Sequence, residues 1–237
     1  MEFFFSKNIG KDLITLESTE FRHCIKVMRN NIGDLINVID GEGALFEGKI
    51  ISINKGNCQI EIQNITKNYS EKPYYTHIAI SPIKNHDRLE WFVEKSIEIG
   101  VDEVSFINCS RTLRKKIKID RLYRTAITAL KQTLKAKLPI INQPIDINDF
   151  IKNCNNKNKF ICHLENEDRK SLFSFKKDIK KHPNICILIG PEGDFTLDEI
   201  ILSENFGFNS VTLGDSRLRT ETAGVVSCNI VSIIQSL

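Results

Sequence analysis

Two glycine-bearing loops near the C-terminus carry the residues best suited to do chemistry. The first loop spans 189–195 and reads Ile-Gly-Pro-Glu-Gly-Asp-Phe, directly after an apolar run. The second loop spans 213–223 and carries Arg219 and Glu221 among small polar residues. Glycine lets a backbone approach a ligand closely, and Pro191 stiffens the first turn. Both loops therefore have the composition of a ligand site.

Neither loop matches the common phosphate-binding motifs. A Walker A loop needs Gly-x4-Gly-Lys-Ser/Thr, and a dinucleotide fingerprint needs Gly-x-Gly-x-x-Gly directly after a strand. Both patterns are absent from the two loops. What remains is a site where backbone amides and carbonyls hold a largely uncharged group, such as an adenosine. Gly-Pro-Glu-Gly alone is also an ordinary tight turn, whereas two such loops together favour a ligand site.

Strands and helices alternate after residue 73, which predicts an α/β domain with a mostly parallel sheet covered on both faces. Ligands bind beyond the carboxyl ends of strands in such sheets, so both loops lie at the predicted binding edge. Asp87 with Glu90, and Thr196 with Glu199, resemble helix capping boxes. We predict strands at 75–81, 104–107, 160–164, 185–189 and 210–213, and helices at 87–99, 120–134, 196–205 and 222–235.

The first 70 residues are β-rich instead. Apolar residues alternate over 46–53 and 57–62, and the turn Asn54-Lys-Gly-Asn57 between them predicts a hairpin. Short strands with frequent turns predict a small β-barrel. One helix is expected at 18–29, capped by Ser18 or Thr19. The polar stretch 67–73 is the predicted linker between domains at 1–70 and 74–237.

Composition and charge limit the class of protein. Hydrophobic residues make up 41% of the 237 residues, and no apolar run approaches the roughly 20 residues that cross a bilayer. The N-terminus lacks the features of a signal peptide, so we expect a cytoplasmic protein without membrane contact. The seven cysteines include no Cys-x-x-Cys pair, which argues for reduced core thiols and against a metal site.

Positive charge is concentrated in one segment. Ten Lys and Arg residues against one acid, Asp120, give residues 111–137 a charge of +9. Because the whole chain carries +3, the remainder carries −6. Such a segment favours a polyanionic partner, although a solvated lysine-rich helix face would look similar.

Three motifs near the C-terminus occur in a fixed order: Gly190-Pro-Glu-Gly193, Leu213-Gly214 and Leu218-Arg-Thr-Glu-Thr-Ala223. Together they resemble the bacterial 16S rRNA (uracil-N3)-methyltransferase family of the SPOUT, or trefoil-knot, class. His23-x-x-x-Val27-x-Arg29 with Asp40-Gly-x-Gly43 resembles the N-terminal PUA-like barrel of that family. The stretch 87–103 resembles the first helix and strand of its catalytic domain. One departure is Asp194, which stands where the family more often has a second glycine.

The resemblance implies a C-terminal SPOUT domain with a deep trefoil knot, a homodimer, and 3-methyluridine formed in 16S rRNA of the small ribosomal subunit. It also implies that S-adenosylmethionine lies in the knot. The implied cofactor-binding residues are Leu164, Ile189, Gly190, Pro191, Glu192, Gly193, Leu213, Gly214, Leu218, Arg219, Thr220, Thr222 and Ala223.

Methylation at N3 of uracil needs an accessible base and loss of the N3 proton, but it needs no metal because a sulfonium already activates the methyl group. We expect Arg219 to stabilise the uracil anion as it forms. Glu221 either accepts the proton, orients Arg219, or is a helix-start carboxylate favoured by the helix dipole. His23 is a weak catalytic candidate with a core or cap role, and His163 is a pocket wall.

Phosphate contacts are expected from basic residues in three places along the chain. These residues are Arg22, Lys26, Arg29, Lys84, Arg88, Arg111, Arg114 and Lys115. Two alternatives stay open at this stage: a 2′-O-ribose methyltransferase of the same knotted class, and a non-catalytic RNA-binding factor in ribosome assembly.

Overall fold

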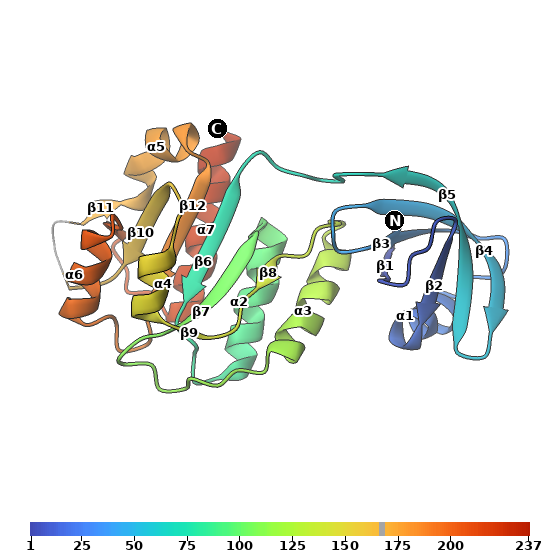
Figure 1. Ribbon diagram of the computed structural model, residues 1–237, viewed down its shortest axis with the longest axis horizontal. Helices are drawn as coiled ribbons and strands as arrows, with labels where there is room; N and C mark the ends of the chain where they lie inside the picture. Colours follow the sequence, from blue (N-terminus) through green and yellow to red (C-terminus); the bar gives the residue numbers. More distant parts are fainter. Residues whose placement is uncertain (166–168) are drawn as a thin grey trace. The chain divides into compact units, whose positions relative to one another are not determined.

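The computed structural model describes residues 1–165 and 169–237 (Figure 1). The chain forms two units. Unit 1 comprises Met1–Glu71 together with Ile127–Leu138, and unit 2 comprises Lys72–Ala126 with Pro139–Leu237. The change of unit at Glu71 falls within the stretch predicted as a linker, whereas the return of 127–138 to unit 1 has no counterpart in the sequence prediction.

Unit 1 is built on a mostly antiparallel sheet with the strand order β1-β3-β4-β5-β2. The predicted hairpin is confirmed, because β4 and β5 pair around the turn at residues 54–57. Phe4, Ile14, Val38, Ile50 and Ile60 fill its core. The strands are β1 (Phe3–Phe5), β2 (Leu13–Glu17), β3 (Leu35–Ile39), β4 (Leu45–Asn54) and β5 (Asn57–Thr66).

The helix expected at 18–29 differs from the prediction. It begins as α1 (Ser18–Arg22) and continues as a π-helical turn, η1 (His23–Val27). The residue before the helix is Glu17, whose side chain makes no capping bond, so capping by Ser18 or Thr19 is wrong. Ser18 has a φ of 51°, outside the extended conformation that a capping residue needs.

The segment 127–138 completes the core of unit 1. It contains the last six residues of α3 (Ile119–Gln132). Leu130 and Ala136 pack in a buried cluster with Phe3, Ile39 and Leu45.

Unit 2 contains the predicted parallel sheet. Its strand order is β11-β13-β10-β12-β6-β7-β8, with β9 pairing beside β7, and these pairs are parallel. The strands are β6 (Tyr75–Ile80), β7 (Glu103–Asn108), β8 (Ile140–Ile141), β9 (Ile145–Asp146), β10 (Asn158–Cys162), β11 (Lys170–Ser171), β12 (Asn184–Ile189) and β13 (Asn209–Thr212). The trefoil knot stays a prediction.

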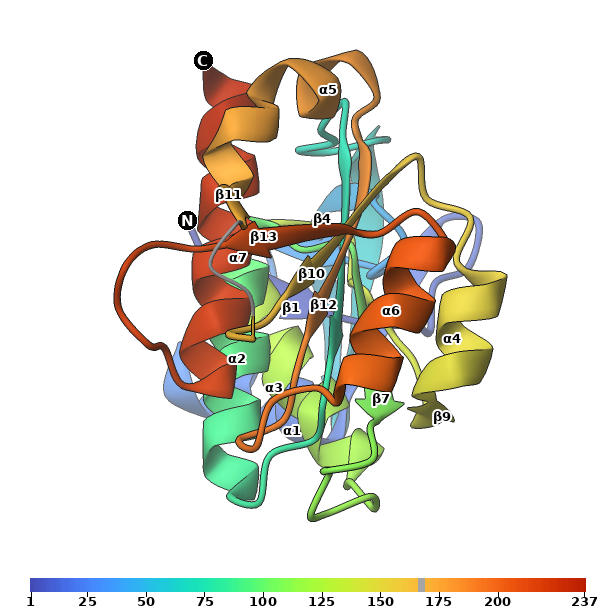
Figure 2. The same cartoon turned by 90° about the vertical axis from the view of Figure 1, so that its left-hand side faces the viewer.

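Helices cover both faces of this sheet (Figure 2). α2 (His86–Ile99) and α7 (Thr220–Ser236) pack together on one face, and α4 (Ile147–Asn153) and α6 (Leu197–Asn205) pack on the other. A short helix, η2 (Leu172–Phe175), leads into α5 (Lys176–Lys181), which contacts α7. None of the helices formed by the described residues has the length and apolarity needed to span a bilayer.

The N-termini of α6 and α2 differ in whether they form the capping box predicted from the sequence. The Thr196–Glu199 capping box is confirmed at α6, where both reciprocal bonds are present. The expected Asp87–Glu90 box is wrong, because Asn85 caps α2 by accepting from the backbone N–H of Asp87. Asn85 satisfies the backbone N–H of Asp87, and α2 starts at His86, one residue earlier than predicted.

Candidate active site

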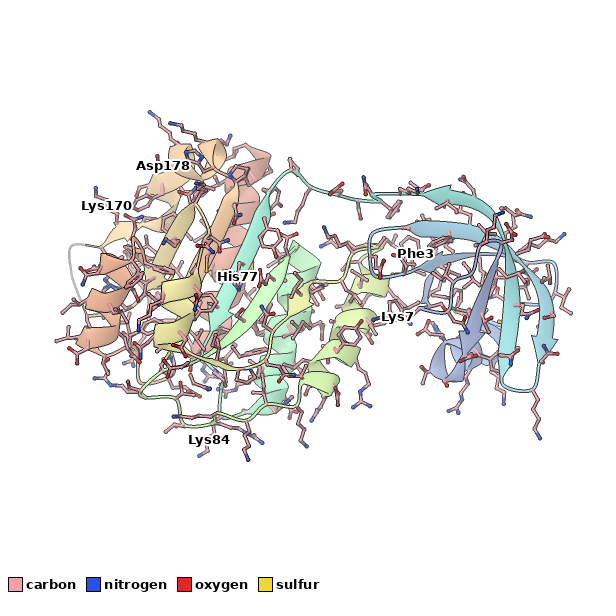
Figure 3. All side chains as sticks on the ribbon, viewed as in Figure 1. Phe3, Lys7, His77, Lys84, Lys170 and Asp178 are labelled. Carbon is pink, nitrogen blue, oxygen red and sulfur yellow. The ribbon has the colours of Figure 1, made fainter. Side chains whose placement is uncertain are left out.

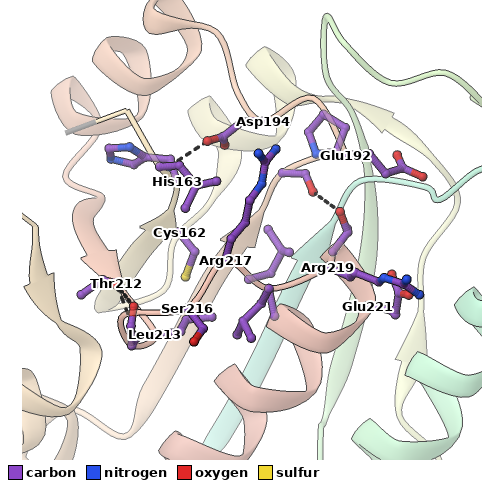
Figure 4. Close-up of a pocket in the computed structure, with 18 of the residues that line it drawn as sticks. Cys162, His163, Glu192, Asp194, Thr212, Leu213, Ser216, Arg217, Arg219 and Glu221 are labelled. Carbon is purple, nitrogen blue, oxygen red and sulfur yellow. Dashed lines mark hydrogen bonds between the residues drawn. The ribbon is translucent and has the colours of Figure 1, made fainter. Parts of the chain in front are cut away.

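The two glycine loops meet around a cavity of about 410 Å³ at the carboxyl edge of the sheet in unit 2 (Figure 4). The register of β10 with β12 and β13 brings these strand ends side by side. Eleven of the residues predicted to bind a cofactor line the cavity: Leu164, Ile189, Gly190, Pro191, Glu192, Leu213, Gly214, Leu218, Arg219, Thr220 and Ala223. Gly193 and Thr222 are not among the lining residues.

Other lining residues escaped the sequence prediction. Cys162, Val211 and Thr212 lie at the last positions of β10 and β13, so their place at strand ends was the available signal. Arg169 comes from a connecting segment without a recognisable pattern, whereas Arg217 lies within the predicted second loop but was not named as a cofactor contact. His163 lines the cavity, as the prediction of a pocket wall requires.

A direct contact joins the two glycine loops. The hydroxyl of Thr220 is buried and donates to the carbonyl of Gly190 at 3.1 Å. A Cβ atom at Gly190 would lie 3.0 Å from ring carbons of Phe195, which is fully buried. Glycine at 190 therefore lets the loop pass between the Phe195 ring and the start of α7.

Asp194 ties the first loop to the end of β10. One carboxylate oxygen accepts from the backbone N–H of Leu164 at 2.7 Å (Figure 4). The other accepts from the backbone N–H of Phe195 at 2.8 Å. Its φ of 62° lies in the left-handed region, which glycine adopts freely and aspartate tolerates better than most residues. This conformation explains how aspartate can replace a glycine here, and the carboxylate adds a contact that glycine cannot make.

Arg111 also forms hydrogen bonds to the first glycine loop. Its guanidinium donates to the carbonyl of Gly193 at 2.8 Å and to that of Phe195 at 3.2 Å. Arg114 similarly donates to the carbonyl of Lys84 at 3.1 Å. Both arginines were predicted as RNA contacts, and the structure gives each of them a bond within unit 2.

The charged residues at the start of α7 occupy different surroundings. Arg219 is exposed, lines the cavity, and forms no ion pair among the described residues. Glu221 is only 5% exposed and lies in the first turn of α7, where the helix dipole favours a negative charge. Its carboxylate lies 3.6 Å from the guanidinium of Arg88, which comes from α2 and also lines the cavity. The ion pair of Glu221 is thus with Arg88.

The thiol and the imidazole at the cavity wall are uncharged. Burial raises the pKa of Cys162 to about 12, so the thiol stays protonated at neutral pH and is a poor nucleophile. Burial, together with the nearby charge of Arg169, lowers the pKa of His163, whose Nε2 lies 2.8 Å from the hydroxyl of Ser210. The described residues contain no cluster of His, Cys, Asp and Glu that could hold a metal ion. Carboxylates and guanidinium groups therefore supply the charge of this site.

The remaining predicted RNA contacts are exposed. Arg22, Lys26 and Arg29 lie on or just after the α1–η1 helix of unit 1, and Lys84 and Lys115 lie in unit 2. His23 is half-buried, with its ring 5.7 Å from that of Phe4, in keeping with a core role.

Comparisons with known proteins agree along the whole chain. Residues 70–232 match an RNA methyltransferase domain, and residues 16–63 match an RNA methyltransferase PUA domain. The ribosomal RNA small subunit methyltransferase E of Buchnera aphidicola is 33% identical over 219 residues, which covers 89% of this chain and 84% of that protein.

Solved structures of rRNA methyltransferases are also similar to this chain. A "probable rRNA-methyltransferase" from Porphyromonas gingivalis superposes with a TM-score of 0.91 at 35% identity, over 100% of this chain and 99% of the other. A ribosomal RNA small subunit methyltransferase E from Neisseria gonorrhoeae bound to S-adenosyl methionine gives a TM-score of 0.83 at 26% identity, over 96% and 95% of the two chains. The chain belongs to the ribosomal RNA small subunit methyltransferase E family.

Proposed function

We propose that this protein transfers a methyl group from S-adenosylmethionine to N3 of a uridine in 16S rRNA of the small ribosomal subunit. The observation that carries this proposal is the joining of both glycine loops around one cavity whose rim holds the exposed Arg219. Family membership supports the rRNA substrate, and a relative bound to S-adenosyl methionine supports the methyl donor.

The cavity suits an adenosylmethionine molecule. Its volume of about 410 Å³ lies within the roughly 300–1,000 Å³ of small-molecule sites. Ile189, Val211 and Leu218 give it an apolar wall, and the loop backbones give it hydrogen-bonding groups. Bound adenosylmethionine would supply a methyl group activated by its sulfonium, so the protein needs only to position the base and manage its proton.

The residues at the start of α7 would assist removal of the N3 proton of uracil. A neutral imide nitrogen is a poor nucleophile, so the N3 proton has to leave as the nitrogen attacks. Arg219 carries fixed donors that can stabilise the negative charge developing on uracil. Glu221 accepts the proton directly or through water, and Arg88 holds the Glu221 carboxylate in place.

The experiment that tests this proposal is methylation of small subunits from a strain that lacks the activity. Nucleosides from the treated 16S rRNA are analysed by mass spectrometry, and the modified position is mapped. We expect 3-methyluridine at one site. A 2′-O-methylated nucleoside would instead identify a ribose methyltransferase, and adenosylmethionine binding without methyl transfer would identify an assembly factor.

Unit 1 and the basic residues of unit 2 would bind the RNA. The exposed cations listed above can neutralise several phosphates, so RNA binding should weaken steeply as salt concentration rises. We further propose that the protein works in the cytoplasm and as a homodimer, for which light scattering of the purified protein is the direct test.

A further inference from the structure

A second cavity, of about 680 Å³, lies at the amino edge of the same sheet. Its lining includes Tyr75 and Glu103, the first residues of β6 and β7, and the segment 142–145 that leads into α4. The glycine loops follow the other ends of the strands, so the two cavities are separate. Figure 3 labels His77, which lies on β6 and contributes to this second cavity.

A polar network, buried at His77 and Ser105 and partly exposed at its other members, forms one wall of the cavity. The hydroxyl of Tyr75 donates to Glu103 at 2.8 Å, and the amide of Asn142 donates to Glu103 at 2.7 Å and to Ser105 at 2.8 Å. Nε2 of His77 lies 2.8 Å from the hydroxyl of Ser105. His77 is 6% exposed and Ser105 is 3% exposed.

This network interrupts an otherwise apolar surface. Further along the same face of the sheet, Ala79, Ile107 and Leu188 are fully buried in an apolar cluster. Helix-covered faces of parallel sheets are normally apolar throughout, and burying polar groups is costly even when they are paired. A polar wall facing a cavity is better explained by a ligand than by folding.

The carboxylate of Glu103 carries a charge that the network does not neutralise. Among the described residues its ionic neighbour is His77, with Nδ1 of the ring 3.6 Å from a carboxylate oxygen. Burial lowers the pKa of His77, so the ring is neutral at physiological pH. Tyr75 and Asn142 use one lone pair on each oxygen, which leaves the carboxylate able to accept two more hydrogen bonds from the cavity.

We propose that this cavity binds a guanine base, with Glu103 as its recognition group. Two adjacent N–H donors match the two oxygens of one carboxylate, as a guanidinium does. Guanine presents such a pair, at N1 and N2, whereas adenine, cytosine and uracil have no two adjacent N–H donor groups on their Watson–Crick edges. Phe150, whose ring packs edge-on against His77 at 5.4 Å between centroids, gives the cavity an apolar wall against which the base can lie.

The ligand is either a guanine of an RNA strand or a free guanine nucleotide, since both present the same base edge. The site goes beyond methyl transfer and does not depend on it. A protein that methylates RNA but does not bind guanine would contradict only this inference. A protein that binds guanine but does not methylate RNA would contradict only the proposed function.

The first experiment compares GMP with IMP on the full-length wild-type protein by saturation-transfer NMR and titration. IMP lacks only the N2 amino group, so it is the matched control for recognition by a carboxylate. We expect GMP to bind at least about 10-fold more tightly than IMP, because IMP lacks the N2 donor and so forms one hydrogen bond fewer to the charged carboxylate of Glu103. We also expect nuclear Overhauser contacts between GMP and the Phe150 ring. Equal affinities, or contacts only to residues of the other cavity, would overturn the proposal.

The second experiment uses Glu103→Gln, with Glu94→Gln on α2 as the control variant. Glu103→Gln should abolish the preference for GMP, and Glu94→Gln should retain it. Adenosylmethionine affinity, measured by calorimetry, reports folding of both variants, because that cavity lies at the other edge of the sheet. If Glu103→Gln does not fold, the comparison of GMP with IMP on wild type still decides the proposal. A folded Glu103→Gln protein that keeps the preference would overturn it.

A third arm identifies the source of the base. An unpaired RNA oligonucleotide with one guanosine is compared with the same oligonucleotide carrying inosine. Displacement of GMP by the first alone supports the guanine site and assigns it to RNA. Binding of GMP without displacement by either oligonucleotide supports the site and assigns it to a free nucleotide. Displacement by both oligonucleotides equally would contradict guanine recognition.

Discussion

The guanidinium of Arg88 lies 3.6 Å from the carboxylate of Glu221, and this pair joins α2 to the first turn of α7. Arg88 had been predicted as a phosphate contact, and Glu221 as a partner for Arg219 or for the proton. Arg88 lines the cavity, and Arg219 is a cation of the same cavity that forms no ion pair with an acidic residue among the described ones.

Replacing Arg219 with alanine should reduce methylation far more than adenosylmethionine binding. Arg219 acts on charge that develops as uracil loses its proton, so its loss should lower kcat by ~10²- to 10³-fold. Single-turnover methylation and calorimetry with adenosylmethionine separate the two effects. Arg217→Ala, which removes another exposed arginine of the same cavity, is the matched control. Equal turnover in Arg219→Ala and wild type would remove Arg219 from the chemistry.

Glu221→Gln should lower turnover more than Arg88→Ala does. Glutamine cannot take up a proton at neutral pH, so Glu221→Gln should lower kcat by about 10²-fold or more. Arg88→Ala keeps the Glu221 carboxylate and removes only the guanidinium that lies 3.6 Å from it, so its kcat should fall less. Single-turnover methylation compares the two variants, and calorimetry with adenosylmethionine checks that both bind the methyl donor. Wild-type turnover in Glu221→Gln would show that Glu221 is not the proton acceptor.

Arg111→Ala should weaken adenosylmethionine binding although Arg111 is not among the residues that line the cavity. Its guanidinium restrains the carbonyls of Gly193 and Phe195, so the first glycine loop should lose order without it. Hydrogen bonds to a charged donor contribute about 1.5–3 kcal/mol, and loss of part of that would raise the Kd about 10-fold. Lys116→Ala, an exposed cation of the same segment, should leave the Kd unchanged. An unchanged Kd in Arg111→Ala would mean that the loop needs no such restraint.

Gly224→Ala tests the packing of α7 on α2. A Cβ atom at residue 224 would overlap the ring of Phe92, which is fully buried. Overpacking of this kind costs about 1–3 kcal/mol, which exceeds the gain of ~1 kcal/mol in helix propensity. We expect a lower Tm by calorimetry, with Asn229→Ala on the exposed side of α7 as the control. A Tm equal to that of wild type would show that the two helices can move apart.

Stability should fall as the pH drops below 6.5, partly because of His77. Burial lowers the pKa of His77 below the usual histidine value of about 6.5. Below pH 6.5 the unfolded chain therefore binds a proton at this ring more readily than the folded protein does. The contribution of His77 to the free energy of unfolding is therefore fully present above pH 6.5. It is lost progressively as the pH falls from 6.5 to the lowered pKa of the folded protein. His163 acts in the same direction. Urea unfolding of wild type and His77→Gln between pH 7 and 5 should show a smaller slope for the variant.

The sheet of unit 2 was predictable because its strands and helices follow simple patterns. Apolar runs such as 185–189 mark strands buried on both faces, and the Thr196–Glu199 pair marks the start of α6. Short elements such as α4 and β9 were not predicted, because a few residues are too short a stretch to show a hydrophobic periodicity. The hairpin at 54–57 was readable because its turn residues are specific.

The lining residues of the first cavity could be predicted where they belong to contiguous motifs. They could not be predicted where they depend on contacts between distant parts of the chain. The Gly-Pro-Glu-Gly loop and the segment 218–223 identify the cavity wall directly. No local pattern reports that Arg111 reaches Gly193 or that Arg88 reaches Glu221, since those pairs are 82 and 133 positions apart in the chain. The second cavity went unseen for the same reason, because strand pairing alone brings Tyr75, Glu103 and Asn142 together.

The core of unit 1 includes Leu130 and Ala136, far along the chain from the strands they cover. A fragment ending at Glu71 would expose Phe3, Ile39 and Leu45 where those residues pack. Recombination at a single junction therefore cannot exchange this unit between proteins as an intact module. Unit 1 should therefore have been inherited together with unit 2. Phylogenetic trees built separately from the two units should have the same branching order.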